Sequence, residues 1–479
     1  MNELIRLSAS AVVDLLRGGE ITPLEAVDAA AARIEATNPR INALPTLCLD
    51  RARDHARRLM ENRPTSEDPA WHLSGLPIAV KDLVNVAGVR TTLGSSVFAD
   101  HVPERSDLLV ENLERRGAVV VAKANTPEFG HGANTFNEVF GKTLNPWNTA
   151  LTSGGSSGGS AAALATGQVW LATGSDLGCS LRTPAAFCSV VGLRPSPGRV
   201  AAGPRGAPIG EVWDTLNVEG SMGRTVADVA LMLDAQAVWH PMDPLSLPPP
   251  SISFGQSVAR PKAPVRVAFS PDLGVVPVES ELKEICSGAA ARFSELGATV
   301  EEACPDLADA REIFHVLRAH HLVGELAPVI EAHHDKIKPE VIWNFEEGLK
   351  LGSGDIARAE RSRAALYYRV VEFFRRYDLL LTPATAVSPF DVNERYVTEV
   401  AGQKLDTYYD WYWICYAITV TSCPALSVPC GFTASGLPVG LQMVGPPRGE
   451  STVLAAAAMF EEMVGIAGRL PIEPRLGSA

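Results

Sequence analysis

The chain has 479 residues, of which 46% are hydrophobic and 20% are charged, the composition of a folded globular protein rather than a disordered one. Aspartate and glutamate outnumber lysine and arginine by 55 to 42, which gives a net charge of −13, and no basic run indicates a nucleic-acid-binding protein. Length alone fits two or three domains, or one large α/β sheet.

The cysteines and the N-terminal segment indicate the compartment. The eight cysteines are scattered without a CxxC pair, which is typical of reduced thiols rather than of a disulfide framework. Residues 1–16 carry acidic groups where a signal peptide would be basic, and no apolar stretch is long enough to span a bilayer. We therefore expect a cytoplasmic protein with no membrane partner.

Helical and strand-like segments alternate along the first half of the chain. Thr22, Pro23 and Glu25 form a capping box with proline at the first helical position, which predicts a helix that continues through residues 24–36. Such alternation favours an α/β sandwich built on a largely parallel or mixed sheet. The short apolar runs that predict strands are 77–80, 118–123, 168–173 and 265–270.

The second half begins with a proline-rich segment. Five prolines make residues 241–262 either a linker or a long surface loop, because proline blocks both helix continuation and sheet pairing. Residues 309–378 are expected to be mostly helical, and residues 379–384, LLLTPA, to form a buried strand of the sheet.

Two serines in glycine-rich turns and one lysine are the candidate chemical groups. Ser156 lies in SGGSSGGSAAA, and an alanine-rich helix follows at once, so this run is a loop fixed to a helix rather than a flexible tether. Ser180 lies in a second turn, GSDLGCSLRTPAAFC, and Lys81 ends the apolar run 77–80. A nucleophile, a proton relay and a base of this kind suit acyl transfer without histidine or metal.

Three other motifs do not fit their usual chemistry. The GKT at 141–143 lacks the glycine that a phosphate-binding loop needs, because Phe136 holds that position. Ser280 and Lys283 match SxxK by chance on a helix surface. The adjacent histidines at 320–321 and 333–334 would face opposite ways on a helix, so we predict no metal site.

A nucleophile elbow remains an alternative. Gly154, Ser156 and Gly158 fit GxSxG, which would make Ser156 the nucleophile of an α/β-hydrolase-type esterase. The elbow needs a strand directly before it, whereas NPWNTALTS at 145–153 is turn-forming, and the elbow does not explain the second serine turn. Its histidine would be one of His315, His320 and His333.

Five motifs in order between residues 70 and 445 together resemble the amidase signature family. They are GLPIAVKDLVNVAG, NTPEFGHGANTFNEVFGKTLNPWN, GGSSGGSAA, GSDLGCSLRTPAAFC and PALSVPCGFTASGLPVGLQMVG. The resemblance implies a single α/β/α sandwich domain with a mixed central sheet covered by helices. Its parts would be N-terminal helices 1–65, a catalytic core 70–235, a Pro-rich loop 240–262, a mostly helical substrate-covering region 263–380 and a return to the sheet 381–479.

The resemblance also implies a Ser-cis-Ser-Lys triad that needs no cofactor. Carried over by position, Ser180 is the nucleophile, Ser156 the bridging serine held by a cis peptide bond, and Lys81 the base. Lys81 must then be uncharged, so burial has to lower its pKa, and we expect Asp82 to point away from it or to bind backbone. The oxyanion would meet backbone N–H groups of Leu177, Gly178, Cys179 and Ser180.

The remaining positions implied by the resemblance support the site or bind substrate. Ser157, Asp176 and Arg182 are supporting residues, with the last two forming a buried ion pair that we favour over binding of a substrate carboxylate. Cys179 stands where most relatives have glycine; its side chain would clash if φ is positive, and it would narrow the acyl pocket. The loop of Gly130, His131 and Gly132 would lie beside the leaving group.

These residues predict a hydrolase for amides of apolar acids or arylamines. The aromatic run 408–416 and the helical region 315–343 would line an apolar entrance or pack in the core. The same chemistry accepts esters, and the alternatives are a carbamate hydrolase, the glutaminase subunit of a tRNA amidotransferase and an inactive binding protein. Apart from the small-molecule substrate we expect no partner, in a monomer or homodimer.

Overall fold

An 11-stranded sheet runs through the whole chain. The computed structural model describes residues 3–61, 69, 71–203 and 212–477. The strand order is β1-β3-β2-β8-β10-β9-β16-β17-β13-β11-β12, with parallel pairs around β2 and β11 and antiparallel pairs elsewhere. The strands are β1 (Thr46–Leu47), β2 (Pro77–Lys81), β3 (Val119–Ala124), β8 (Leu171–Asp176), β9 (Val191–Arg194), β10 (Val218–Gly223), β11 (Arg266–Phe269), β12 (Thr299–Glu302), β13 (Leu379–Pro383), β16 (Ala425–Phe432) and β17 (Pro438–Val444).

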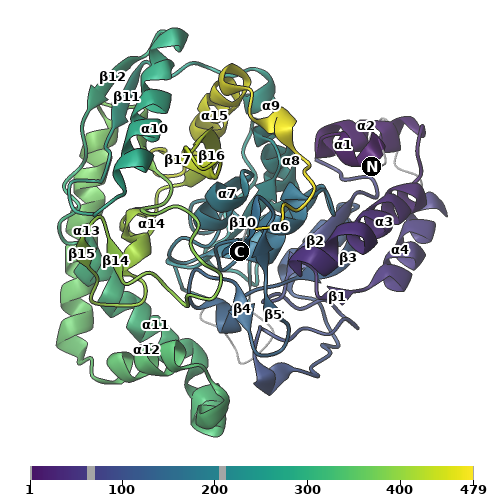
Figure 1. Cartoon of the computed structure of the whole chain (residues 1–479), viewed down its shortest axis with the longest axis horizontal. Helices are drawn as coiled ribbons and strands as arrows, with labels where there is room; N and C mark the ends of the chain where they lie inside the picture. Colours follow the sequence, from purple (N-terminus) through teal and green to yellow (C-terminus); the bar gives the residue numbers. More distant parts are fainter. Residues whose placement is uncertain (1–2, 62–68, 70, 204–211, 478–479) are drawn as a thin grey trace.

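Helices bury both faces of this sheet. In β2, Ile78 and Val80 belong to one apolar core and Ala79 to another, because successive side chains of a strand point to opposite faces. The predicted mixed sheet covered by helices is therefore confirmed, and so are all five predicted strands (Figure 1). The flanking helices are α1 (Glu3–Arg6), α2 (Ala9–Gly18), α3 (Pro23–Ile41), α4 (Leu49–Glu61), α5 (Leu108–Arg115), α6 (Gly158–Ala165), α7 (Arg182–Cys188), α8 (Val226–Gln236), α10 (Ser280–Ala291) and α15 (Glu450–Val464).

Three helices and a short aromatic helix stand at the far side from the N-terminus (Figure 1, green). They are α11 (Ala310–His333), α12 (Pro339–Leu349), α13 (Ser353–Phe374) and α14 (Trp413–Thr419). A separate apolar cluster joins α11 and α12 to Phe98 and Phe129, two side chains of the N-terminal half. The predicted helical region is thus confirmed, and it packs against loops at the carboxyl end of the early strands.

The proline-rich segment is ordered and contains a helix, α9 (Phe254–Ala259), with a capping box at Ser253 and Gln256. α9 packs against α8 and α15. Strands on either side of the segment share the sheet, since β9 precedes it and its neighbour β16 follows it.

The remaining strands form three small hairpins. They pair β4 (Phe136–Asn137) with β5 (Gly141–Lys142), β6 (Leu144–Asn145) with β7 (Asn148–Thr152), and β14 (Glu399–Val400) with β15 (Gln403–Lys404). Among the described residues, no helix is both long and apolar enough to cross a membrane.

Candidate active site

Lys81 is held at the end of β2, between the parallel strands β3 and β8. Its side chain is fully buried, and Nζ lies 2.7 Å from Ser156 Oγ and 3.0 Å from Ser175 Oγ. Ser175 was missed as a site residue, although it lies within the quoted GSDLG motif. Only the pairing of β2 with β8 brings it beside the lysine.

The carboxylate next to Lys81 is turned away from it. Asp82 Oδ1 accepts a hydrogen bond from Lys123 Nζ at 2.8 Å, and Oδ2 accepts from the Thr92 N–H and hydroxyl at 3.1 and 2.6 Å. Lys123 and Asp82 form a fully buried ion pair. The expectation that Asp82 avoids Lys81 is confirmed, so Asp82 does not hold the Lys81 ammonium in its charged form by direct contact.

Ser156 lies in a buried loop that enters α6, not in a tether. The peptide bond between Gly155 and Ser156 is cis, as the resemblance implies. Gly154 has a φ of +76°, a conformation that suits glycine, and a Cβ on Gly155 would lie 2.9 Å from the Ala133 carbonyl carbon. Backbone geometry therefore requires these glycines.

Ser157 joins the two serine loops. Its N–H donates to the Ser180 carbonyl at 3.3 Å, and its hydroxyl donates to the Ser175 carbonyl at 3.5 Å. These contacts suit the supporting role expected for it.

Ser180 stands between the end of β8 and the start of α7 on a loop braced by an ion pair. Arg182 donates to Asp176 through Nε at 3.0 Å and through Nη2 at 2.8 Å, and both side chains are fully buried. Burial opposes ionisation of the carboxyl group, but Arg182 and then Arg194 hold the pKa of Asp176 below its ordinary value. The carboxylate also accepts from the Leu181 N–H at 3.0 Å.

The guanidinium of Arg182 has no N–H left for a substrate. Besides Asp176 its acceptors are four groups of the protein: the carbonyls of Gly178 and Cys415, the amide oxygen of Gln442 and the hydroxyl of Thr419. Because all five donors are used inside the protein, Arg182 is a structural residue.

The expected oxyanion donors lie on this braced loop. Within the described part of the chain, the backbone N–H groups of residues 177–180 donate no hydrogen bond. All four residues line the cavity that contains Ser156, Ser175 and Ser180. The loop therefore offers free N–H groups beside the candidate nucleophile.

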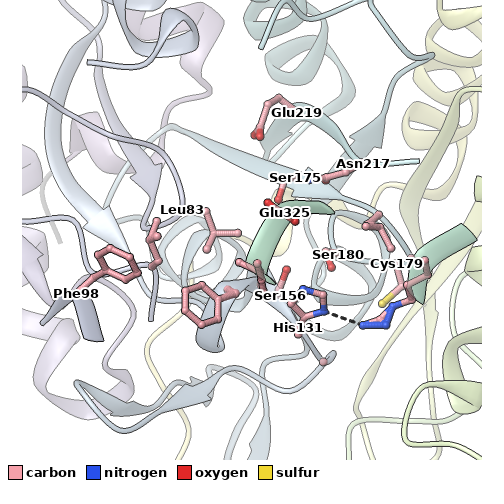
Figure 2. A pocket seen from close by; sticks show the side chains of 18 of the residues that line it. Leu83, Phe98, His131, Ser156, Ser175, Cys179, Ser180, Asn217, Glu219 and Glu325 are labelled. Carbon is pink, nitrogen blue, oxygen red and sulfur yellow. Dashed lines mark hydrogen bonds between the residues drawn. The ribbon is translucent and has the colours of Figure 1, made fainter. Parts of the chain in front are cut away.

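The cavity has two dissimilar sides. Figure 2 shows Leu83 and Phe98 on one side of Ser156 and Ser180, and Cys179 on the other. A Cβ on Gly130 would lie 2.7 Å from Leu83 Cδ1 and 3.5 Å from Ser156 Oγ. Of the regions expected at the entrance, the aromatic run contributes Tyr412 and the helical region contributes Arg318, Glu325 and Leu326. Three lining residues were not singled out by sequence reasoning: Phe129, Asn217 and Glu219.

His131 forms part of the cavity wall in a neutral state. Its Nδ1 lies 2.9 Å from Arg318 Nη2, the dashed contact in Figure 2, and Lys338 Nζ donates to its carbonyl. Burial, then the charge of Arg318, holds the pKa of His131 well below its ordinary value. Gly132, with a φ of +93°, follows it and also lines the cavity.

Cys179 fits the loop without strain. Its φ is not positive, so the clash expected for a side chain here does not arise. Burial, then Cys415 and Asp176, raises the pKa of the Cys179 thiol well above its ordinary value. A neutral thiol is a poor nucleophile, and the side chain instead narrows the cavity beside Ser180.

The elbow interpretation fails, although one argument against it was wrong. Residues 145–153 are not turn-forming throughout, because β7 pairs with β6 and runs to Thr152. This strand lies outside the central sheet, whereas an elbow strand belongs to it. The three candidate histidines do not line the cavity; His315 contacts Asp410 at 3.2 Å, and His320 is exposed.

Known proteins resemble the chain over nearly its full length. A family model for amidases matches residues 25–454. An acylamidase of Rhodococcus erythropolis is 33% identical over 98% of this chain and 97% of its own. A glutamyl-tRNA(Gln) amidotransferase subunit of Moorella thermoacetica is 34% identical over 96% of this chain and 97% of its own.

Solved structures share the fold. A bacterial aryl acylamidase has a TM-score of 0.84 at 28% identity, with 97% of this chain and 99% of its own covered. A 6-aminohexanoate cyclic dimer hydrolase has a TM-score of 0.87 at 26% identity, with 98% and 99% covered. The sequence motifs, the sheet and these relatives agree: the chain is an amidohydrolase that belongs to the amidase signature family.

Proposed function

We propose that this amidohydrolase cleaves the C–N bond of linear amides of apolar acids or arylamines through an acyl-enzyme on Ser180. The observation that carries the proposal is the contact of 2.7 Å between Lys81 Nζ and Ser156 Oγ, since Ser156 lines the same cavity as Ser180. Ser156 and Ser180 thus line one cavity, and Lys81 is buried behind Ser156.

These positions support the following reaction. Neutral Lys81 accepts the proton of Ser156 while Ser156 takes the proton of Ser180, whose Oγ attacks the amide carbonyl carbon. The N–H groups of residues 177–180 stabilise the oxyanion. Collapse breaks the C–N bond, Ser156 gives its proton to the leaving nitrogen and regains one from Lys81, and the amine departs. Water then attacks the acyl-enzyme by the same relay and releases the acid.

The substrate class is supported by the apolar side of the cavity. Leu83, Phe98 and Phe129 line it near Ser156, and apolar and aromatic walls favour apolar or aryl groups. Esters and carbamates would react through the same kind of acyl-enzyme. Substrates of both classes that carry apolar or aryl groups are therefore tested beside the amides.

Substitution of each proposed catalytic residue tests the mechanism. We expect Ser180→Ala to lower kcat for a 4-nitroanilide by roughly 1,000-fold or more, with Ser156→Ala and Lys81→Ala similar, because such residues act as a unit. Intact-mass spectra of the wild type should show an acyl adduct that maps to Ser180. The control, Cys179→Ala, should still acylate. An adduct on Ser156, or wild-type turnover by Ser180→Ala, contradicts the assignment.

A glutaminase component of an amidotransferase is a second candidate, favoured by the 34% identity to the Moorella thermoacetica protein. Such a chain would work in a complex and have little activity on aryl amides when alone. We expect the isolated chain to hydrolyse aryl amides and to release little ammonia from glutamine. The reverse result in an ammonia assay would favour the glutaminase.

A further inference from the structure

Arg318, on α11, is a buried cation in the wall of the cavity. Its Nη1 donates to Asn344 Oδ1 at 2.6 Å, and its Nη2 contacts His131 Nδ1 at 2.9 Å and donates to the Tyr408 hydroxyl at 2.8 Å. All three partners are neutral groups. The guanidinium is itself charged at any ordinary pH.

Two other buried cations near the site are each paired with an anion. Lys123 pairs with Asp82, and Arg182 with Asp176. Arg318, by contrast, forms no ion pair within the described part of the chain, and its Nε is buried without an acceptor. The rings of Tyr409 and Tyr408, 4.7 and 5.5 Å from the guanidinium carbon, stabilise the charge only in part. A buried, uncompensated charge favours an anionic ligand.

The position of Ser156 decides which part of a substrate reaches Arg318. Ser156 must protonate the leaving nitrogen, so the leaving group lies beside Gly130 and Leu83, which are next to Ser156 Oγ. The acyl substituent then extends to the opposite side, where Cys179 lies (Figure 2). Tyr412 and Phe314 both pack against Gly178 on that side, and the guanidinium carbon of Arg318 lies 6.0 Å from the centre of the Phe314 ring. Arg318 is therefore on the acyl side.

We propose that Arg318 binds a carboxylate on the acyl part of the substrate, so that the preferred substrates are aryl monoamides of dicarboxylic acids. This inference rests on the proposed function, because it uses the direction of proton transfer from Ser156. Nη2 uses both of its N–H groups on His131 and Tyr408, so the Nε–H and the second N–H of Nη1 are left to donate charge-assisted hydrogen bonds to a carboxylate. The arylamine occupies the apolar side.

Matched substrates test the proposal. The 4-nitroanilides of malonic, succinic, glutaric and adipic monoacids are compared with their methyl esters, which keep the length and remove the charge. We expect one acid to exceed its ester in kcat/KM by roughly 10- to 100-fold, the effect of hydrogen bonds to a charged group. Arg318→Met should bring the acid-to-ester ratio of kcat/KM to about one through a rise in KM for the acid. Arg318→Lys should restore part of the preference for the acid.

A second cation at the same loop is the matched control. Lys338 Nζ donates to the His131 carbonyl, but Lys338 does not line the main cavity. We expect Lys338→Met to change kcat/KM for acid and ester in the same proportion. If Arg318 only positioned His131, Arg318→Met would act in the same way, and the proposal would be wrong.

The outcomes separate this proposal from the proposed function. If the methyl-ester anilides are hydrolysed and no anilide with a free acid is preferred, the role of Arg318 is overturned and the amidohydrolase mechanism stands. Absence of turnover for all anilides contradicts both. A dependence on Arg318 that appears only for N-acyl-4-aminobenzoates, whose carboxylate is on the leaving group, overturns the acyl-side assignment. Should Arg318→Met not fold, the wild-type acid-to-ester ratio decides alone.

Discussion

At the scale of single residues, we predict that Cys179 limits the size of the acyl group that fits beside Ser180. Its side chain lines the cavity, and its φ lies outside the left-handed region. We expect Cys179→Gly to raise kcat/KM for hexanoyl over acetyl 4-nitroanilide by about 10-fold, because removal of one side chain from a pocket changes discrimination by about 1–3 kcal/mol. The control is Cys188→Ala, a buried thiol outside the cavity. An unchanged acyl preference in Cys179→Gly would contradict the assigned wall position.

Arg182 is a residue whose loss should affect folding more than substrate binding. Arg182→Met leaves the Asp176 carboxylate buried with Arg194 as its remaining cation, and breaking a buried pair costs about 3–5 kcal/mol. We expect the free energy of unfolding, measured in urea, to fall by that amount. Arg40→Met, which removes an exposed partner of Glu473, should cost less than about 1 kcal/mol. A similar small loss for Arg182→Met would refute the bracing role.

At the scale of elements, the start of α8 depends on a side chain of α15. Both carboxylate oxygens of Glu461 accept from the Val226 N–H, at 3.0 and 3.2 Å. Burial raises the pKa of Glu461 to about 8 from an ordinary 4.5, and Asp228 nearby adds to the shift. Between pH 4.5 and 8, therefore, the folded protein keeps a proton on Glu461 that the unfolded chain has already lost.

This contact predicts a pH dependence of stability. Since the folded state binds more protons in that window, the free energy of unfolding should fall as the pH rises from 5 to 8. Glu461→Gln carries no titrating proton and should flatten this decline in urea midpoints measured at each pH. Glu462→Gln, at an exposed neighbour, should keep the wild-type slope. Parallel curves for wild type and Glu461→Gln would show that Glu461 does not titrate in this window.

At the scale of the whole molecule, the two halves of the chain are interlocked. β9 and β16 pair across the proline-rich segment, α7 packs on β16 and β17, and Arg182 bonds to Cys415 and Gln442. The N-terminal half contains the three proposed catalytic residues, but the C-terminal half completes their support.

We therefore predict that the chain unfolds as one cooperative unit. Urea transitions followed by far-UV circular dichroism and by tryptophan fluorescence should coincide, because Trp170 and Trp411 are buried in opposite halves. A truncation to residues 1–240 should lack a cooperative transition, since it exposes the edge of β9. Two separated transitions, or a folded truncation, would indicate independent domains.

The sequence by itself determined the family, the candidate triad, the capped α3 and the strands around it, because these depend on local spacing and on motifs that lie close together. It could not place Ser175 beside Lys81 or show that Asp82 pairs with Lys123, since both depend on which strands are neighbours. Only the tertiary structure decided that Arg318, more than 130 residues downstream of Ser180, enters the cavity wall without an anionic partner among the described residues. The spacing of apolar residues predicts that this segment is helical. Which groups surround Arg318 depends on how α11 packs over the loops, and that packing is decided by the tertiary structure.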